Sequence, residues 1–132
     1  MKALTLRQPW ASLVAAGAKR WETRSWATRY RGPLAIHAAA GWRPVDVAHV
    51  PWPAALAMRV EDWERLPRGT VVAIAELVEC LPAEAVAPGA PEALFGDFAP
   101  GRWAWRLEGV RSLDPPVPAR GRLGLWEISL SP

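Results

Sequence analysis

The apolar and polar positions at the start of the chain predict a strand followed by a helix. Residues 2–6 read as a short strand. In residues 8–17 the apolar side chains recur at helical spacing, with Pro9 at the first helical position and Gly17 at the end. Trp10 lies on the apolar face, where a core position is more common than a ligand contact. We therefore expect Trp10 to anchor the helix, and we keep it as a candidate ligand-binding residue.

The next segment, residues 20–25, alternates side chains as a strand does. One face would carry Arg20, Glu22 and Arg24, and the other Trp21, Thr23 and Ser25. This alternation assigns Trp21 to the core side. It also places Glu22 and the two arginines together on a polar face, which is the face of functional interest.

The rest of the chain continues with short strands and short helical pieces. Further strands are predicted at residues 34–39, 69–81, 102–107 and 125–130, and helical turns at residues 54–58 and 83–86. Residues 82–101 hold four prolines and three glycines, which is typical of a long loop. Five or six short strands with helices at their connections predict an α+β fold in which the sheet closes into a small barrel. We expect one domain over residues 1–132.

Cysteine and histidine usage limits the chemistry that the chain can support. The only cysteine is Cys80, and the two histidines are far apart in the sequence, so no metal site is expected. Because His37 falls inside the strand 34–39, a core histidine with satisfied hydrogen bonds is the favoured interpretation. Walker, dinucleotide-binding and nucleophile-elbow motifs are not found, so we expect no cofactor.

The same composition bears on location. A single cysteine cannot form an internal disulfide, and the first residues lack the charged-then-apolar pattern of a secretory signal. No apolar run approaches the length that spans a membrane. The sequence therefore predicts a cytoplasmic protein with no membrane partner.

Charge is unevenly distributed along the chain. The formal net charge is +3, but residues 1–43 carry eight Lys or Arg and one acidic residue, Glu22. Residues 44–100 carry three arginines and nine acidic residues. A concentrated cationic region attracts phosphate-bearing partners more effectively than a high isoelectric point alone. The first third is therefore the expected binding region.

Residues 17–31 concentrate that charge and add aromatic rings. Unpaired backbone N–H groups at the predicted helix start near Gln8 would seat an anion, and Lys19 and Arg24 would complete the seat. A second basic segment, residues 120–124, would face it. The candidate ligand-binding residues are Gln8, Trp10, Lys19, Glu22, Arg24, Trp26, Arg29, Tyr30, Arg31, Arg120 and Arg122. The alternative is structural: Glu22 and Arg24 form an ordinary ion pair, and Trp26 and Tyr30 cover the open end of the barrel.

The chain resembles the ASCH domain family in its coactivator-type form. The motif Gly17-x-Lys19-x-x-Glu22-x-Arg24 matches the family signature, and three further blocks match in order, at residues 8–11, 28–38 and 120–126. The resemblance implies a PUA-like β-barrel with helices at its ends and a cleft lined by the signature. It also implies binding of RNA, another nucleic acid or a nucleotide-like small molecule.

Two other functions stay open at this point. Some members of the family hydrolyse RNA or a modified nucleoside such as acetylated cytidine, and are thought to use a lysine, a threonine three residues later and a glutamate from a later strand. Here Lys19 is kept, Glu22 occupies the threonine position, and Glu76 or Glu79 would supply the glutamate; Lys19 and Glu22 are catalytic only if the chain is an enzyme. Thr23 is expected to point away from Glu22. A protein–protein interaction module with a tryptophan-rich surface is the third option.

Overall fold

The structure is a computed structural model that describes residues 1–41 and 52–130. Its elements are β1 (Lys2–Leu6), α1 (Trp10–Ala15), β2 (Trp21–Arg24), β3 (Gly32–Ala38), α2 (Trp52–Ala55), η2 (Val60–Arg65), β4 (Thr70–Pro82), η3 (Ala83–Ala85), η4 (Glu92–Leu94), β5 (Trp103–Pro118) and β6 (Leu125–Glu127), where η marks a short 3-10 helix. The strands at residues 2–6, 20–25, 34–39 and 69–81 are confirmed to within two residues at either end. The helical turn predicted at residues 83–86 is present as η3.

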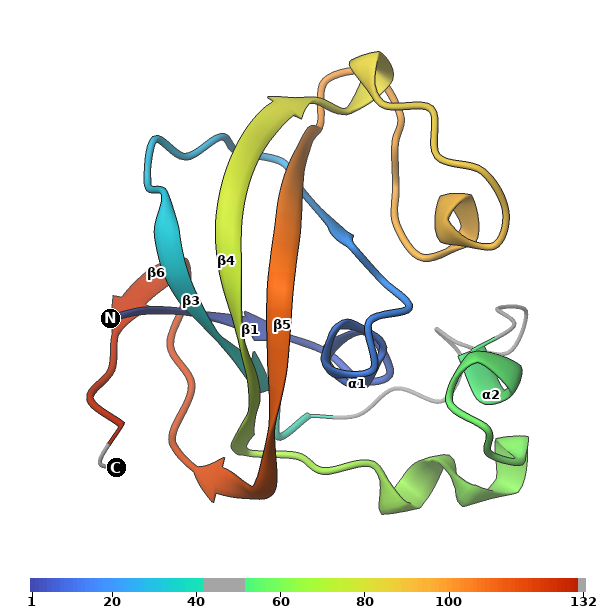
Figure 1. The fold of residues 1–132 in the computed structure, drawn as a ribbon, viewed down its shortest axis with the longest axis vertical. Coiled ribbons are helices and arrows are strands. Elements are labelled where there is room, and N and C mark those ends of the chain that lie inside the picture. Colours follow the sequence, from blue (N-terminus) through green and yellow to red (C-terminus); the bar gives the residue numbers. More distant parts are fainter. Residues whose placement is uncertain (42–51, 131–132) are drawn as a thin grey trace.

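The described strands form one six-stranded sheet in the order β2-β5-β4-β3-β1-β6. The β1–β3 pair is parallel, and the other neighbouring pairs are antiparallel. Figure 1 shows β4 and β5 as two long curved strands that run side by side through the middle of the molecule. Register shifts along β4 and β5 accompany this curvature, since a bulge bends the strand that carries it. The sheet curls into a half-barrel, which confirms the α+β, PUA-like class.

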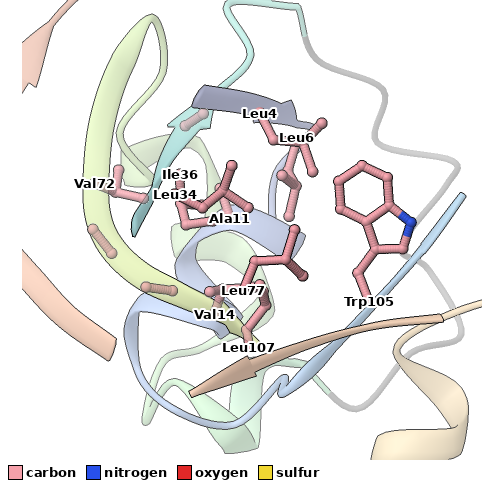
Figure 2. Close-up of a cluster of buried hydrophobic side chains, with 13 residues drawn as sticks. Leu4, Leu6, Ala11, Val14, Leu34, Ile36, Val72, Leu77, Trp105 and Leu107 are labelled. Carbon is pink, nitrogen blue, oxygen red and sulfur yellow. The ribbon is translucent and has the colours of Figure 1, made fainter. Parts of the chain in front are cut away.

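The concave side of the sheet is filled by apolar side chains. Leu34, Ile36, Leu77 and Trp105 are fully buried there, together with Val14 from α1. Figure 2 shows these side chains pointing into the same space between the curved strands and the helix. The short helix α1 therefore plugs one side of the curled sheet, which fixes the position of the chain on either side of it.

The fifth strand is much longer than expected. The sequence predicted a strand at residues 102–107, whereas β5 continues to Pro118, and Thr70 of β4 is its last partner. Prolines at positions 115, 116 and 118 argue against a strand because they lack the backbone N–H that a ladder uses. The strand tolerates them at its far end, beyond the buried portion, where most residues are exposed.

The segment between β4 and β5 folds back over the sheet. Figure 1 shows it projecting to one side of the two long strands before it returns. Phe95 anchors it by packing with Leu13 and Trp52 in a second buried cluster. The Glu92 carboxylate accepts hydrogen bonds from the Arg20 backbone N–H at 3.0 and 3.1 Å. These contacts hold residues 92–97 beside β2, where they form one wall of a cleft.

Candidate functional site

A cleft of about 730 Å³ opens beside β2. Residues 22–26 line one side of it, residues 94–97 form a wall, residues 122–124 form the opposite wall, and residues 5–7 lie at the end of β1. Trp10, Lys19, Ala39 and Arg102 complete the described lining. Residues from both basic segments identified in the sequence, 17–31 and 120–124, therefore line this one cleft.

Lys19 lies at the base of this cleft with only 1% of its surface exposed. Its ammonium donates to the Trp21 carbonyl oxygen at 2.7 Å and to the Phe95 carbonyl oxygen, and it lies 3.5 Å from Glu22 Oε1. Burial lowers the pKa of Lys19, although the nearby carboxylates of Glu22 and Glu92 oppose this effect. Trp21 and Glu22 belong to β2, and Phe95 belongs to the wall at residues 94–97. The Lys19 side chain therefore links this wall, the loop wall, to β2.

Glu22 is buried between two cations. Its Oε1 accepts from the Thr23 backbone N–H at 3.2 Å, and its Oε2 accepts from Arg24 Nε at 3.0 Å and lies 3.0 Å from Arg24 Nη2. Arg24 Nη2 also donates to the Thr5 carbonyl oxygen at 2.7 Å. This bond connects the edge strand β2 with β1, which lies near the other edge of the sheet. Arg24 therefore helps to close the half-barrel and presents its charge in the cleft.

Thr23 lines the cleft, as Glu22 does. Its Oγ1 accepts from the Asp97 backbone N–H at 3.0 Å. Strand alternation does turn neighbouring side chains to opposite faces, but here residues 94–97 fold over β2 and extend the cleft around it. The lining does not include Glu76 or Glu79, both of which the structure describes. The structure therefore brings neither glutamate into the cleft beside Lys19.

The tryptophans near the cleft have different surroundings. Trp26 lines the cleft and packs edge-on against Trp105, with ring centroids 4.8 Å apart. Trp10 packs against the core and also lines the cleft, with its ring 5.6 Å from Lys19 Nζ. Trp21 is half-buried outside the described core clusters, so its assignment to the core side is wrong. Its ring stacks under the Arg106 guanidinium at 5.6 Å.

Several candidate residues lie outside the cleft. The Tyr30 hydroxyl donates to the Pro33 carbonyl oxygen, and Arg31 donates to the Thr28 and Tyr30 carbonyl oxygens. Arg29 is exposed and is not among the described lining residues. Arg120 lines a neighbouring cavity, whereas Arg122 lines both.

The Gln8 side chain forms its hydrogen bonds with other residues of the protein. Its amide Nε2 donates to Ser12 Oγ at 2.8 Å and to the Pro67 carbonyl oxygen at 2.7 Å, while its Oε1 accepts from the Ser12 backbone N–H at 3.0 Å. Gln8 is buried and is not part of the described cleft lining. The helix α1 has six residues, and the Gln8 side chain occupies one of its first N–H groups. The expected anion seat at this helix start is therefore not part of the cleft.

Sequence reasoning missed Arg7, Asp97 and Arg102, which also line the cleft. Arg102 Nε lies 3.4 Å from Asp97 Oδ2, and Arg102 Nη2 donates to the Thr23 carbonyl oxygen at 3.4 Å. Phe95 and Phe98 were the available signal, because aromatic side chains in a proline- and glycine-rich loop indicate anchor points. The favoured interpretation of His37 agrees with its geometry, since both ring nitrogens have partners, Thr5 Oγ1 at 3.1 Å and the Ala119 carbonyl oxygen at 2.7 Å.

Two searches cover only the described residues. Within residues 1–41 and 52–130, no group of three or more His, Cys, Asp or Glu could hold a metal ion. In the same part of the chain, no helix has the length and apolar character needed to cross a membrane.

Comparison with known proteins gives consistent results. The ASCH domain family matches residues 4–117. Two relatives, Activating signal cointegrator 1 from Mus musculus and from Homo sapiens, are each 39% identical over 82 residues, which is 59% of this chain. The matched region is 14% of each relative, so the chain spans only a small part of their length.

Proposed function

The chain belongs to the ASCH domain family, and on that premise we propose that its cleft binds RNA or a nucleotide-like ligand. The observation that carries the proposal is the meeting of Arg24, Arg122 and Trp26 in one cleft of about 730 Å³. Pockets of about 300–1,000 Å³ are typical of small-molecule and cofactor sites. The cleft therefore has room for at least one nucleotide.

The chemistry of the lining suits both parts of a nucleotide. Arginine guanidinium groups bind phosphate oxygens through paired N–H donors, and Arg122 supplies such a group. Arg24 adds positive charge to the cleft, while its Nε and Nη2 are bonded to Glu22 and to the Thr5 carbonyl oxygen. The carboxylates of Glu22 and Asp97 are acceptors for base amino groups. Trp26 offers a ring against which a base would pack, an interaction worth about 1–3 kcal/mol where it occurs. Phosphate contacts would supply salt-dependent affinity, and base contacts would supply selectivity.

A second candidate function is hydrolysis of RNA or a modified nucleoside. Two observations favour it: burial lowers the pKa of Lys19, and Thr23 lines the same cleft. A lysine with a lowered pKa is better suited to proton transfer near neutral pH. Turnover of acetylated cytidine or RNA that is lost in Thr23→Val, with RNA binding retained, would support this function. A wild-type protein that binds RNA without turnover of either substrate would reject it.

Salt-dependent RNA binding tests the main proposal. We expect wild-type protein to bind fluorescent single-stranded RNA with an affinity that falls as salt rises. Arg122→Ala should weaken binding and reduce the slope of log K against log[salt] by about 1, since one phosphate contact is lost. The measurement is fluorescence anisotropy over a range of salt concentrations.

Arg111→Ala is the matched control for this titration. Arg111 is an exposed β5 arginine outside the described cleft lining, so its replacement makes the same change in net charge. We expect it to have a much smaller effect than Arg122→Ala. Equal losses in the two variants, or no binding at low salt, would overturn the proposal.

A further inference from the structure

A second cavity, of about 380 Å³, lies directly beside the cleft. It is formed by Ala39 and Ala40 after β3, by Gly69 before β4 and by residues 119–123. The two cavities have four lining residues in common: Thr5, Ala39, Arg122 and Leu123. They are therefore contiguous, and a ligand in one is within reach of the other.

Hydrogen bonds fix the position of His37, which lines the second cavity. His37 is buried, and both of its ring nitrogens are hydrogen-bonded. The backbone at Gly121 lies so close to this ring that a Cβ there would be 2.7 Å from His37 Cε1. Glycine is required at this position because any side chain would collide with the imidazole. The segment that contains Ala119 and Gly121 is thus packed against the His37 ring, which fixes this wall of the cavity.

The junction between the two cavities carries an exposed cation and an exposed apolar side chain. The Arg122 guanidinium forms no ion pair with any residue in the described part of the chain. Leu123 is 98% exposed, so its whole side chain is available for contact with a ligand. A phosphate group would form an ion pair with Arg122, and the face of a base would cover the Leu123 side chain. The residues that line only the second cavity are mostly alanine and glycine, so few side chains project into it.

We propose that the two cavities are adjacent subsites for a single RNA strand. The cleft takes one nucleotide, the second cavity takes the base of the next nucleotide, and the connecting phosphodiester lies at Arg122 while Leu123 packs against the second base. Arg120, which also lines the second cavity, contacts the following phosphate. The inference rests on the proposed function and makes it more specific: the preferred ligand is a strand of at least two nucleotides and not an isolated nucleoside.

Calorimetric titration with uridine 5′-monophosphate and with the dinucleotide pUpU, repeated with the other three bases, tests the inference. We expect the dinucleotide to bind at least about tenfold more tightly, which corresponds to about 1.4 kcal/mol from the contacts of the second base and its phosphate. Ala40→Trp should fill the second cavity, because Ala40 lines this cavity and not the cleft. It should remove the advantage of the dinucleotide and leave binding of the mononucleotide unchanged.

Ala54→Trp is the matched control, since Ala54 is an exposed alanine on α2 outside both cavities. It should leave both affinities unchanged. Mononucleotides and dinucleotides that bind equally well would overturn the two-subsite inference while the proposed function stands. A dinucleotide advantage that survives Ala40→Trp would also overturn it. Binding of no nucleotide and no RNA would overturn the proposed function, and the inference with it.

Discussion

Replacing Lys19 by methionine should destabilise the fold by about 3 kcal/mol, although the new side chain is of similar length. The ammonium of Lys19 is the hydrogen-bond donor for the Trp21 and Phe95 carbonyl oxygens, and it pairs with the buried Glu22. A methionine would leave the carbonyl groups without this donor and Glu22 with one cation fewer. The melting temperature should fall by about 10 °C. Urea and thermal unfolding measure both quantities.

Lys2→Met is the matched control for this substitution. Lys2 also forms an ion pair, with its Nζ 2.8 Å from Glu127 Oε1, but both side chains are partly exposed to solvent. Exposed pairs contribute little, so this variant should unfold close to wild type. If Lys19→Met were as stable as Lys2→Met, Lys19 would not be the structural link between the loop wall and β2.

The stability lost in Lys19→Met should grow as the pH rises toward 10.5. Burial lowers the pKa of Lys19 from the ordinary value of 10.5, so the folded protein releases this proton at a lower pH than the unfolded chain does. Between the lowered pKa and 10.5 the unfolded chain holds more protons, and stability therefore rises with pH. The slope reaches at most about 1.4 kcal/mol per pH unit. This pH-dependent contribution of Lys19 to the free energy of unfolding is complete above pH 10.5, and it is lost as the pH falls through the lowered pKa of Lys19.

Urea unfolding of wild type and Lys19→Met at a series of pH values from neutral to 10.5 measures this effect. Other titrating groups are common to both proteins, so their contributions largely cancel in the difference. A difference that is constant with pH would mean that the pKa of Lys19 is not shifted. A difference that shrinks as the pH rises would mean that its pKa is raised, with the carboxylates outweighing burial.

The sequence was sufficient to predict most of the sheet and the pairing of Glu22 with Arg24 on β2, whereas Arg20 lies outside the cleft and contacts Glu92. The apolar, β-branched run at residues 71–75 is typical of a buried strand, and β4 contains it. The spacing of Glu22 and Arg24 places both side chains on one face of a strand, and the two form an ion pair in the cleft. Both predictions depend on local periodicity alone, which a single sequence displays directly.

Features that depend on contacts distant in the sequence could not be predicted in the same way. The wall at residues 94–97 exists because Phe95 packs with Leu13 and Trp52, far away along the chain. Thr23 faces the cleft because that wall folds over β2. Gln8 is removed from the cleft by its bond to the Pro67 carbonyl oxygen. In each case a tertiary contact decides which side of an otherwise correctly predicted element becomes accessible.

The central claim is that the cleft between residues 22–26 and 122–124 is where RNA binds. Photocrosslinking with single-stranded RNA that carries 4-thiouridine, followed by mass spectrometry of the crosslinked peptides, tests it most directly. We expect the crosslinks to fall on peptides that contain Trp26 or residues 122–124. Crosslinks confined to peptides outside the cleft, such as the part of β5 around Arg111, would contradict the claim.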